Sequence, residues 1–156
     1  MLVLLVRVTS LALVSALLVA ACGGDSGPTP PATELKVDGT YATNVAVTQT
    51  TCPSLTVQGN PTTVTHTTGA STLTLTHAGN SYSGTVQRNG AFSTTPKAIT
   101  AGAETHTLTI AGTFSRTAIN ATVTAVVQRS GSADCQYTVT WIGPKQGEPN
   151  VIPGSG

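Results

Sequence analysis

The sequence has very few charged residues, with 7 Lys and Arg and 6 Asp and Glu among 156 residues, or 8%. No basic cluster occurs along the chain, and nucleic-acid binding depends on such clusters. We therefore expect no nucleic-acid partner. Aromatic residues are also scarce, at 4%. A chain of this length and composition is expected to form one modest domain, which we predict to be monomeric.

The common catalytic motifs are missing as well. The chain contains no Gly-x-Ser-x-Gly, no His-Glu-x-x-His, no phosphate-binding loop and no Gly-x-Gly-x-x-Gly. The acids of the central region are Asp38, Glu104 and Asp134, and they lie at the margins of predicted strands, where solvated turn charges are common. We predict that the protein is not an enzyme and needs no cofactor.

Threonine, by contrast, is abundant, at 30 positions, and this favours solvated β-strands over helices. Apolar and polar residues alternate with a period of two. His106, Leu108 and Ile110 share one face of a strand, for example, while threonines occupy the other. The predicted strands are Gly39 to Thr50, Thr62 to Thr67, Ser71 to His77, Ser81 to Arg88, Lys97 to Ala101, Glu104 to Phe114, Ala118 to Arg129, and Asp134 to Ile142.

Residues 1–21 have the pattern of an export signal peptide, with one positive charge at Arg7, an apolar stretch and two final alanines. The sequence Val19-Ala20-Ala21-Cys22 then resembles the lipobox of bacterial lipoproteins, in which the cysteine is acylated and begins the mature chain. This resemblance implies that Cys22 carries diacyl and N-acyl chains, which together anchor a protein stably to a membrane. It also implies a place in the bacterial cell envelope, and Gly23 at the second mature position favours the outer membrane.

Composition divides the rest of the chain into three parts. Residues 22–36 are rich in Gly and Pro and predict a flexible linker behind the lipidated cysteine. Residues 144–156 have a similar composition and predict a disordered tail. The globular domain is therefore expected to span residues 37–143.

Two cysteines remain once Cys22 is assigned to the lipid. Cys52 and Cys135 are an even pair in an exported chain, which predicts a disulfide. Cys52 follows the first predicted strand and Cys135 opens the last one. If the strands alternate up and down, both cysteines lie at the same end, and the first and last strands become antiparallel neighbours.

This pattern predicts an all-β, antiparallel up-and-down barrel of about eight strands. Its outline is similar to the lipocalin and avidin-like barrels, and Gly39-Thr40-Tyr41 loosely resembles the Gly-x-Trp at the start of lipocalins. An immunoglobulin-like β-sandwich is the alternative, with the cysteine pair joining two sheets. In that fold the Trp lies between the cysteines, whereas Trp141 follows Cys135.

Aromatic and His residues at inward positions form the candidate binding site. We predict that Tyr41, His77, Tyr82, His106 and Trp141 line the lumen or rim of the barrel and bind a small apolar or amphipathic molecule. A fully packed core without a cavity is the alternative interpretation of the same residues.

The histidines are also the strongest potential metal ligands of the domain. His77 and His106 fall at one rim of the predicted barrel and His66 at the opposite end, so a metal site would need a further ligand such as Glu104. We therefore predict no metal site. The outward Thr-x-Thr runs support a different function, that of a structural or adhesion-type envelope protein that contacts a protein or glycan through its Thr-rich surface.

Overall fold

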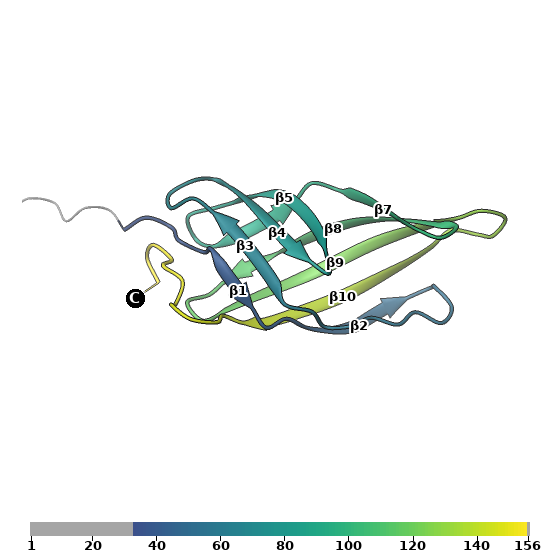
Figure 1. The fold of residues 1–156 in the computed structure, drawn as a ribbon, viewed down its shortest axis with the longest axis horizontal. Coiled ribbons are helices and arrows are strands. Elements are labelled where there is room, and N and C mark those ends of the chain that lie inside the picture. Colours follow the sequence, from purple (N-terminus) through teal and green to yellow (C-terminus); the bar gives the residue numbers. More distant parts are fainter. Residues whose placement is uncertain (1–32, 156) are drawn as a thin grey trace, which may run out of the picture. The chain divides into compact units, whose positions relative to one another are not determined.

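The computed structural model describes residues 33–155. Its strands span Gly39–Tyr41 (β1), Asn44–Thr50 (β2), Thr62–His66 (β3), Thr72–His77 (β4), Asn80–Val86 (β5), Ala91–Thr94 (β6), Lys97–Ala101 (β7), Glu104–Phe114 (β8), Ala118–Arg129 (β9) and Cys135–Pro144 (β10). They form one 10-stranded sheet in the order β1-β3-β4-β5-β6-β8-β9-β10-β2, with β7 paired to β8. The sheet curls into a barrel-like fold (Figure 1), which confirms the predicted all-β, up-and-down architecture. Residues 33–155 include no helix that is long and apolar enough to cross a membrane.

The alternating sequence pattern sets which side chains face the core. In β9, every second residue from Ile119 to Val127 is buried, and the residues between them, from Asn120 to Val126, are exposed. Because successive side chains of a strand point to opposite faces, one face of β9 supplies the core and the other meets water.

The first predicted strand, Gly39 to Thr50, is wrong as a single element because the ladder breaks at Ala42 and Thr43. Its first part, β1, pairs with β3, and its second part, β2, pairs with β10. The Ala42 N–H donates to the Pro144 carbonyl, at 2.9 Å, so this stretch is hydrogen-bonded on both sides where it changes partners. The predicted antiparallel contact between the first and last strands is confirmed by the β2 and β10 ladder.

The short strand β6 was not expected from the sequence. It pairs with the end of β8, while β7 pairs with the beginning of β8. The two behave as one strand interrupted around Pro96, which has no N–H to give to a ladder. With only four residues in β6, the alternation is too brief to stand out in the sequence.

The folded unit is larger than the predicted range of 37–143. Leu35 and Ile152 are only 3% and 9% exposed and belong to the main hydrophobic core. Lys36 and Val151 pair through two backbone hydrogen bonds of 3.0 and 2.9 Å. A single apolar residue in a Pro-rich and Gly-rich segment carries no periodic signal, so only these long-range contacts place it in the core.

The predicted linker of residues 22–36 and the predicted disordered tail of residues 144–156 are therefore wrong where they meet the domain. The predicted signal peptide, Cys22 and the linker up to residue 32 lie outside the described residues. The sheet, the core and the disulfide all lie within one compact unit, residues 31–156. This unit holds the contacts that a domain needs to fold independently.

The predicted disulfide is confirmed. Cys52 and Cys135 are bonded, with their Cα atoms 5.1 Å apart and a sequence separation of 83. The bond joins the loop after β2 to the start of β10. It lies at the end of the sheet where the loops joining β7 to β8 and β9 to β10 are found, which we call the far end.

Candidate functional site

The strands that cross at the centre of the fold have unequal lengths. β8, β9 and β10 contain 11, 12 and 10 residues, whereas β3, β4 and β5 contain 5, 6 and 7. Figure 1 shows the long strands continuing beyond the short ones toward the far end, with β7 and β2 alongside them. The inward, apolar face of the long strands is therefore covered only in part at that end.

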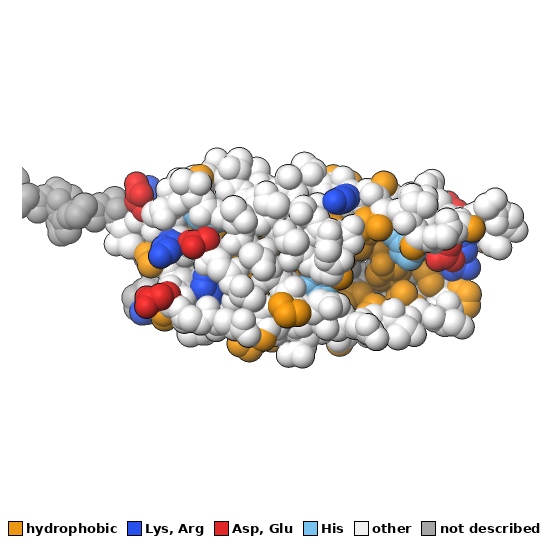
Figure 2. Space-filling view, in the orientation of Figure 1, with side chains coloured by type: hydrophobic (Ala, Val, Ile, Leu, Met, Phe, Trp, Pro, Cys, Tyr) orange, Lys and Arg blue, Asp and Glu red, His pale blue; other side chains and the backbone are white. Residues whose placement is uncertain are grey.

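This uncovered face forms a depression that we call the far-end hollow. Figure 2 shows hydrophobic side chains gathered in it, on the right of the view. It comprises a larger cavity of about 150 Å³ and a smaller one of about 110 Å³ nearer the disulfide. The larger cavity is lined by Val45, Val57, Gln58, His77, Tyr82, Leu108, Val123, Tyr137, Val139 and Trp141.

The inner part of the hollow is built around a stacked pair of rings. His77, at the end of β4, lies with its ring centroid 4.3 Å from that of Trp141 on β10. His77 Nδ1 is 2.9 Å from the Thr62 hydroxyl, to which the Thr43 hydroxyl donates at 2.8 Å. Since the Thr62 hydroxyl accepts from Thr43, its own proton can be donated to His77 Nδ1. Nδ1 is then an acceptor, so a neutral His77 ring carries its proton on Nε2. Burial lowers the pKa of His77, which favours this neutral form.

The outer part of the hollow holds a short polar network. His106 Nδ1 lies 3.4 Å from the Tyr137 hydroxyl, and His106 Nε2 lies 3.3 Å from a Glu104 carboxylate oxygen. The other Glu104 oxygen is 3.3 Å from Arg129 Nε, and the Arg129 guanidinium also contacts the sulfur of Cys135. Because Glu104 and Arg129 compensate each other, the network offers hydrogen-bonding groups at the mouth of the hollow without a large net charge.

One side of the hollow is formed by residues 51–61, which we call the return segment. It leaves the end of β2, is tied to β10 by the disulfide at Cys52, and leads back to β3. Leu55 and Val57 face the hollow from this segment. A Cβ atom at Gly59 would lie 2.9 Å from the Thr43 carbonyl oxygen, so the segment packs closely against the chain just before β2.

The structure brings together four of the five residues predicted to bind a ligand. His77, Tyr82 and Trp141 line the larger cavity, and His106 lines the smaller one. Tyr41 is the exception, and its assignment to this site is wrong. Its side chain does face inward, as predicted, but inward orientation does not specify which end of the barrel a residue occupies.

Tyr41 lies in the core of the opposite end. It is 0% exposed, and its ring centroid is 5.7 Å from that of Phe114. Its hydroxyl lies 2.8 Å from both the Val37 carbonyl oxygen and Asn150 Oδ1. Tyr41 therefore has a structural role, holding the C-terminal segment against the core.

Sequence reasoning missed Leu108, Tyr137 and Arg129 as parts of the site. Leu108 shares the inward face of β8 with His106, and Tyr137 shares that of β10 with Trp141. The period of two was therefore a usable signal for both. Arg129 gave no such signal, since it ends β9 and its contact with Glu104 depends on the register of β8 and β9.

The histidines do not form a metal centre with each other. His66 is buried away from the hollow, with Nε2 2.9 Å from the Ala70 carbonyl oxygen. Within residues 33–155, no group of three or more His, Cys, Asp or Glu residues is arranged to hold a metal ion.

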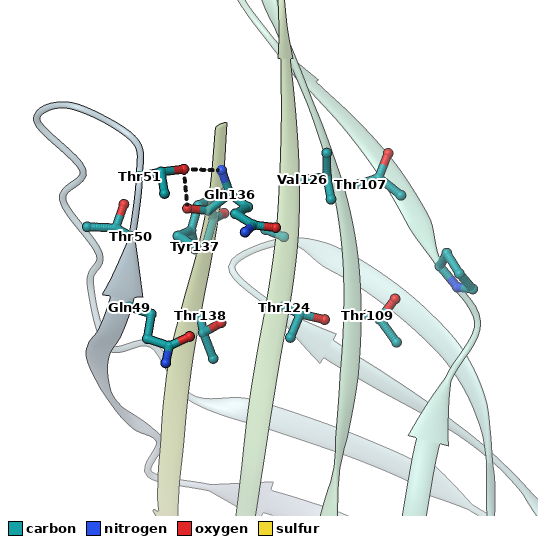
Figure 3. A pocket seen from close by; sticks show the side chains of 12 residues that line it. Gln49, Thr50, Thr51, Thr107, Thr109, Thr124, Val126, Gln136, Tyr137 and Thr138 are labelled. Carbon is teal, nitrogen blue, oxygen red and sulfur yellow. Dashed lines mark hydrogen bonds between the residues drawn. The ribbon is translucent and has the colours of Figure 1, made fainter. Parts of the chain in front are cut away.

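The opposite, Thr-rich face of the same strands carries a broader groove of about 560 Å³ (Figure 3). Thr109, Thr124 and Thr138 lie in register across β8, β9 and β10, and Gln49 of β2 continues the row. The groove edge is fixed by Thr51, whose hydroxyl accepts a hydrogen bond from the Gln136 N–H at 2.9 Å. The described residues that line the groove are all uncharged.

No protein-family model matches the chain, and neither a curated protein nor a solved structure is similar to it. The far-end hollow and the Thr-rich groove are thus the features from which a function can be inferred. The larger cavity of the hollow differs from the groove in being lined mainly by aliphatic side chains and aromatic rings, whereas threonines and glutamines predominate in the groove.

Proposed function

We propose that the protein is a non-catalytic binding module that takes a small apolar or amphipathic molecule into the far-end hollow. One observation carries this proposal: the apolar face of β8, β9 and β10 extends past the strands that cover it, leaving a cavity lined by rings and aliphatic side chains. Burying this surface under a ligand would be favourable at roughly 25 cal/mol per Å².

The size of the hollow limits the ligand. A dry apolar cavity of about 150 Å³ is large enough for benzene, and the larger cavity here has the same volume, about 150 Å³. The hydroxyl of Tyr137 and the ring of His106 offer hydrogen bonds at the mouth. An apolar body with one polar end matches this distribution of groups.

The polar network supports binding better than catalysis. The hydroxyl beside His106 is the phenol of Tyr137, and burial raises its pKa above the usual 10.0. A phenol that ionises less readily is a weaker nucleophile. Its use as a hydrogen-bond donor to a ligand fits its environment better.

Trp141 offers a direct test because it is the single Trp of the chain and lines the hollow. The protein for this test is residues 31–156 with the disulfide formed. Adding toluene, or an indole analogue that does not itself fluoresce, should shift or quench the fluorescence emission of Trp141. Leu108→Glu, which places a charge in the hollow, should abolish the response. Thr107→Glu, one residue away on the opposite face, should leave it intact. Saturating additions without any change in emission or heat would refute the proposal.

We also propose that the chain is an exported lipoprotein, anchored through Cys22 in the cell envelope. The lipobox-like sequence supports this, and so does a disulfide, because such bonds persist in oxidising compartments. Detergent partitioning and intact mass should show the acyl chains on the native protein and lose them in Cys22→Ala. Native protein without added lipid mass would contradict the anchor.

The Thr-rich groove supports a second candidate function, the contact of a protein or glycan through this face. Its volume of about 560 Å³ and uncharged lining suit a neutral polar partner, and β2 is paired on one side only, with β10. Thr107→Glu and Thr124→Glu would weaken such a contact and leave Trp141 emission unchanged. Retention of a soluble glycan or envelope protein that both substitutions abolish would favour this function.

A further inference from the structure

The two cavities of the far-end hollow follow each other along the strands. On β10, Trp141 lines the larger cavity and Cys135 the smaller one. On β9, Val123 and Val127 do the same. Trp141 is six positions beyond Cys135 on β10, which corresponds to about 20 Å at a rise of about 3.3 Å per residue. Together the two cavities, which we call the trough, extend much further than a single ring.

Aliphatic side chains of the return segment line one side of the hollow. Val57 contributes to the larger cavity and Leu55 to the smaller one, while Ile99 of β7 packs against the core beside β8. Leu108 lies on the floor and is covered only in part. A compact ring would fill the larger cavity and leave Leu55, which lines the smaller one, in water.

We propose that the far-end hollow takes an unbranched alkyl chain, such as the acyl tail of a lipid, with its end beside Trp141 and its polar head near Glu104 and Arg129. This inference rests on the proposed function and narrows its ligand class. Half of a bilayer core of about 30 Å corresponds to a tail of about 15 Å, which fits within the length of the trough. The ion pair of Glu104 and Arg129 provides a polar surface at the open end.

The test uses residues 31–156 and a series of straight-chain 1-alkanols of increasing length, kept below their solubility limits. Each added methylene should tighten binding about fourfold, the equivalent of about 0.8 kcal/mol per buried CH₂. The increase should stop once the chain fills the trough. Trp141 emission and titration calorimetry provide two independent readouts.

Leu108→Glu should weaken binding of the longer alkanols at least about tenfold, because it replaces an apolar contact with a charge. Thr107→Glu is the matched control, since it adds the same charge to the neighbouring residue on the opposite face. If Leu108→Glu does not fold, as judged by circular dichroism, Val57→Glu in the return segment places the charge in the same trough.

The outcomes separate the two proposals. Binding of toluene without any gain along the alkanol series would overturn the alkyl-chain inference and leave the proposed function standing. Absence of binding by every compound would overturn both. A gain per methylene that Leu108→Glu leaves unchanged would show that the chains bind outside the hollow, and would also overturn the inference.

Discussion

Removal of the disulfide between Cys52 and Cys135 should destabilise the domain strongly. The bond closes a loop with a sequence separation of 83 residues. In the chain-entropy model, removing a cross-link that closes a loop of this size raises the entropy of the unfolded chain and lowers the free energy of unfolding by about 4.5 kcal/mol at 25 °C. Measured losses are commonly about 2 kcal/mol or more. The loss should be felt most at the far end, because there β2 is held to the sheet only by its ladder with β10.

The variant for this measurement is Cys52→Ser combined with Cys135→Ala. Alanine is chosen at the second position because Cys135 is buried, and alanine adds no polar group to the core. Urea unfolding of residues 31–156, followed by circular dichroism, should show a midpoint lower by about 2 M for a slope of about 2 kcal/mol per M. A loss of stability below about 1 kcal/mol would refute the reasoning, since it would mean that the disulfide hardly restricts the unfolded chain.

Three further predictions use the same unfolding assay. Gly112→Ala should cost about 1–3 kcal/mol or more, because its Cβ would lie 2.1 Å from the Asn120 carbonyl oxygen; unchanged stability would contradict this contact. Burial lowers the pKa of His77 below 6.5, so the unfolded chain binds this proton first as the pH falls. Stability should therefore drop as the pH falls below about 6.5, with a smaller drop in His77→Gln. Tyr41→Phe should cost about 1–3 kcal/mol by leaving the Oδ1 of buried Asn150 without the hydroxyl that donates to it, and a neutral effect would exclude that role.

The sequence predicted most strands closely, including the five-residue β7, whose bounds Lys97–Ala101 match the prediction. β9 has the bounds Ala118–Arg129 that were predicted, because twelve alternating residues leave little room for another period. β6, with four residues, was missed. The break at Ala42 was missed too, since it reflects a change of partner strand, and local sequence does not encode partners.

The candidate site was predictable only in part. Inward orientation follows from alternation, and it correctly grouped His77, Tyr82, His106 and Trp141. Position along the barrel follows from the register of the strands, which places Tyr41 at the end opposite the far-end hollow. The hollow itself arises because neighbouring strands differ in length, a property of the whole sheet.

The stretch from Gly39 to Thr50 pairs first with β3 and then with β10. This change of partner strand has a consequence for the order in which the sheet forms. The first half of the stretch pairs with residues that follow soon after in sequence, as Tyr41 does with Thr62, whereas Val45 in its second half pairs with Trp141. Long-range pairings form slowly because a large loop must close first. A chain synthesised from its N-terminus cannot form the ladder between β2 and β10 until β10 has been made, so we expect this ladder to be the last part of the sheet to form.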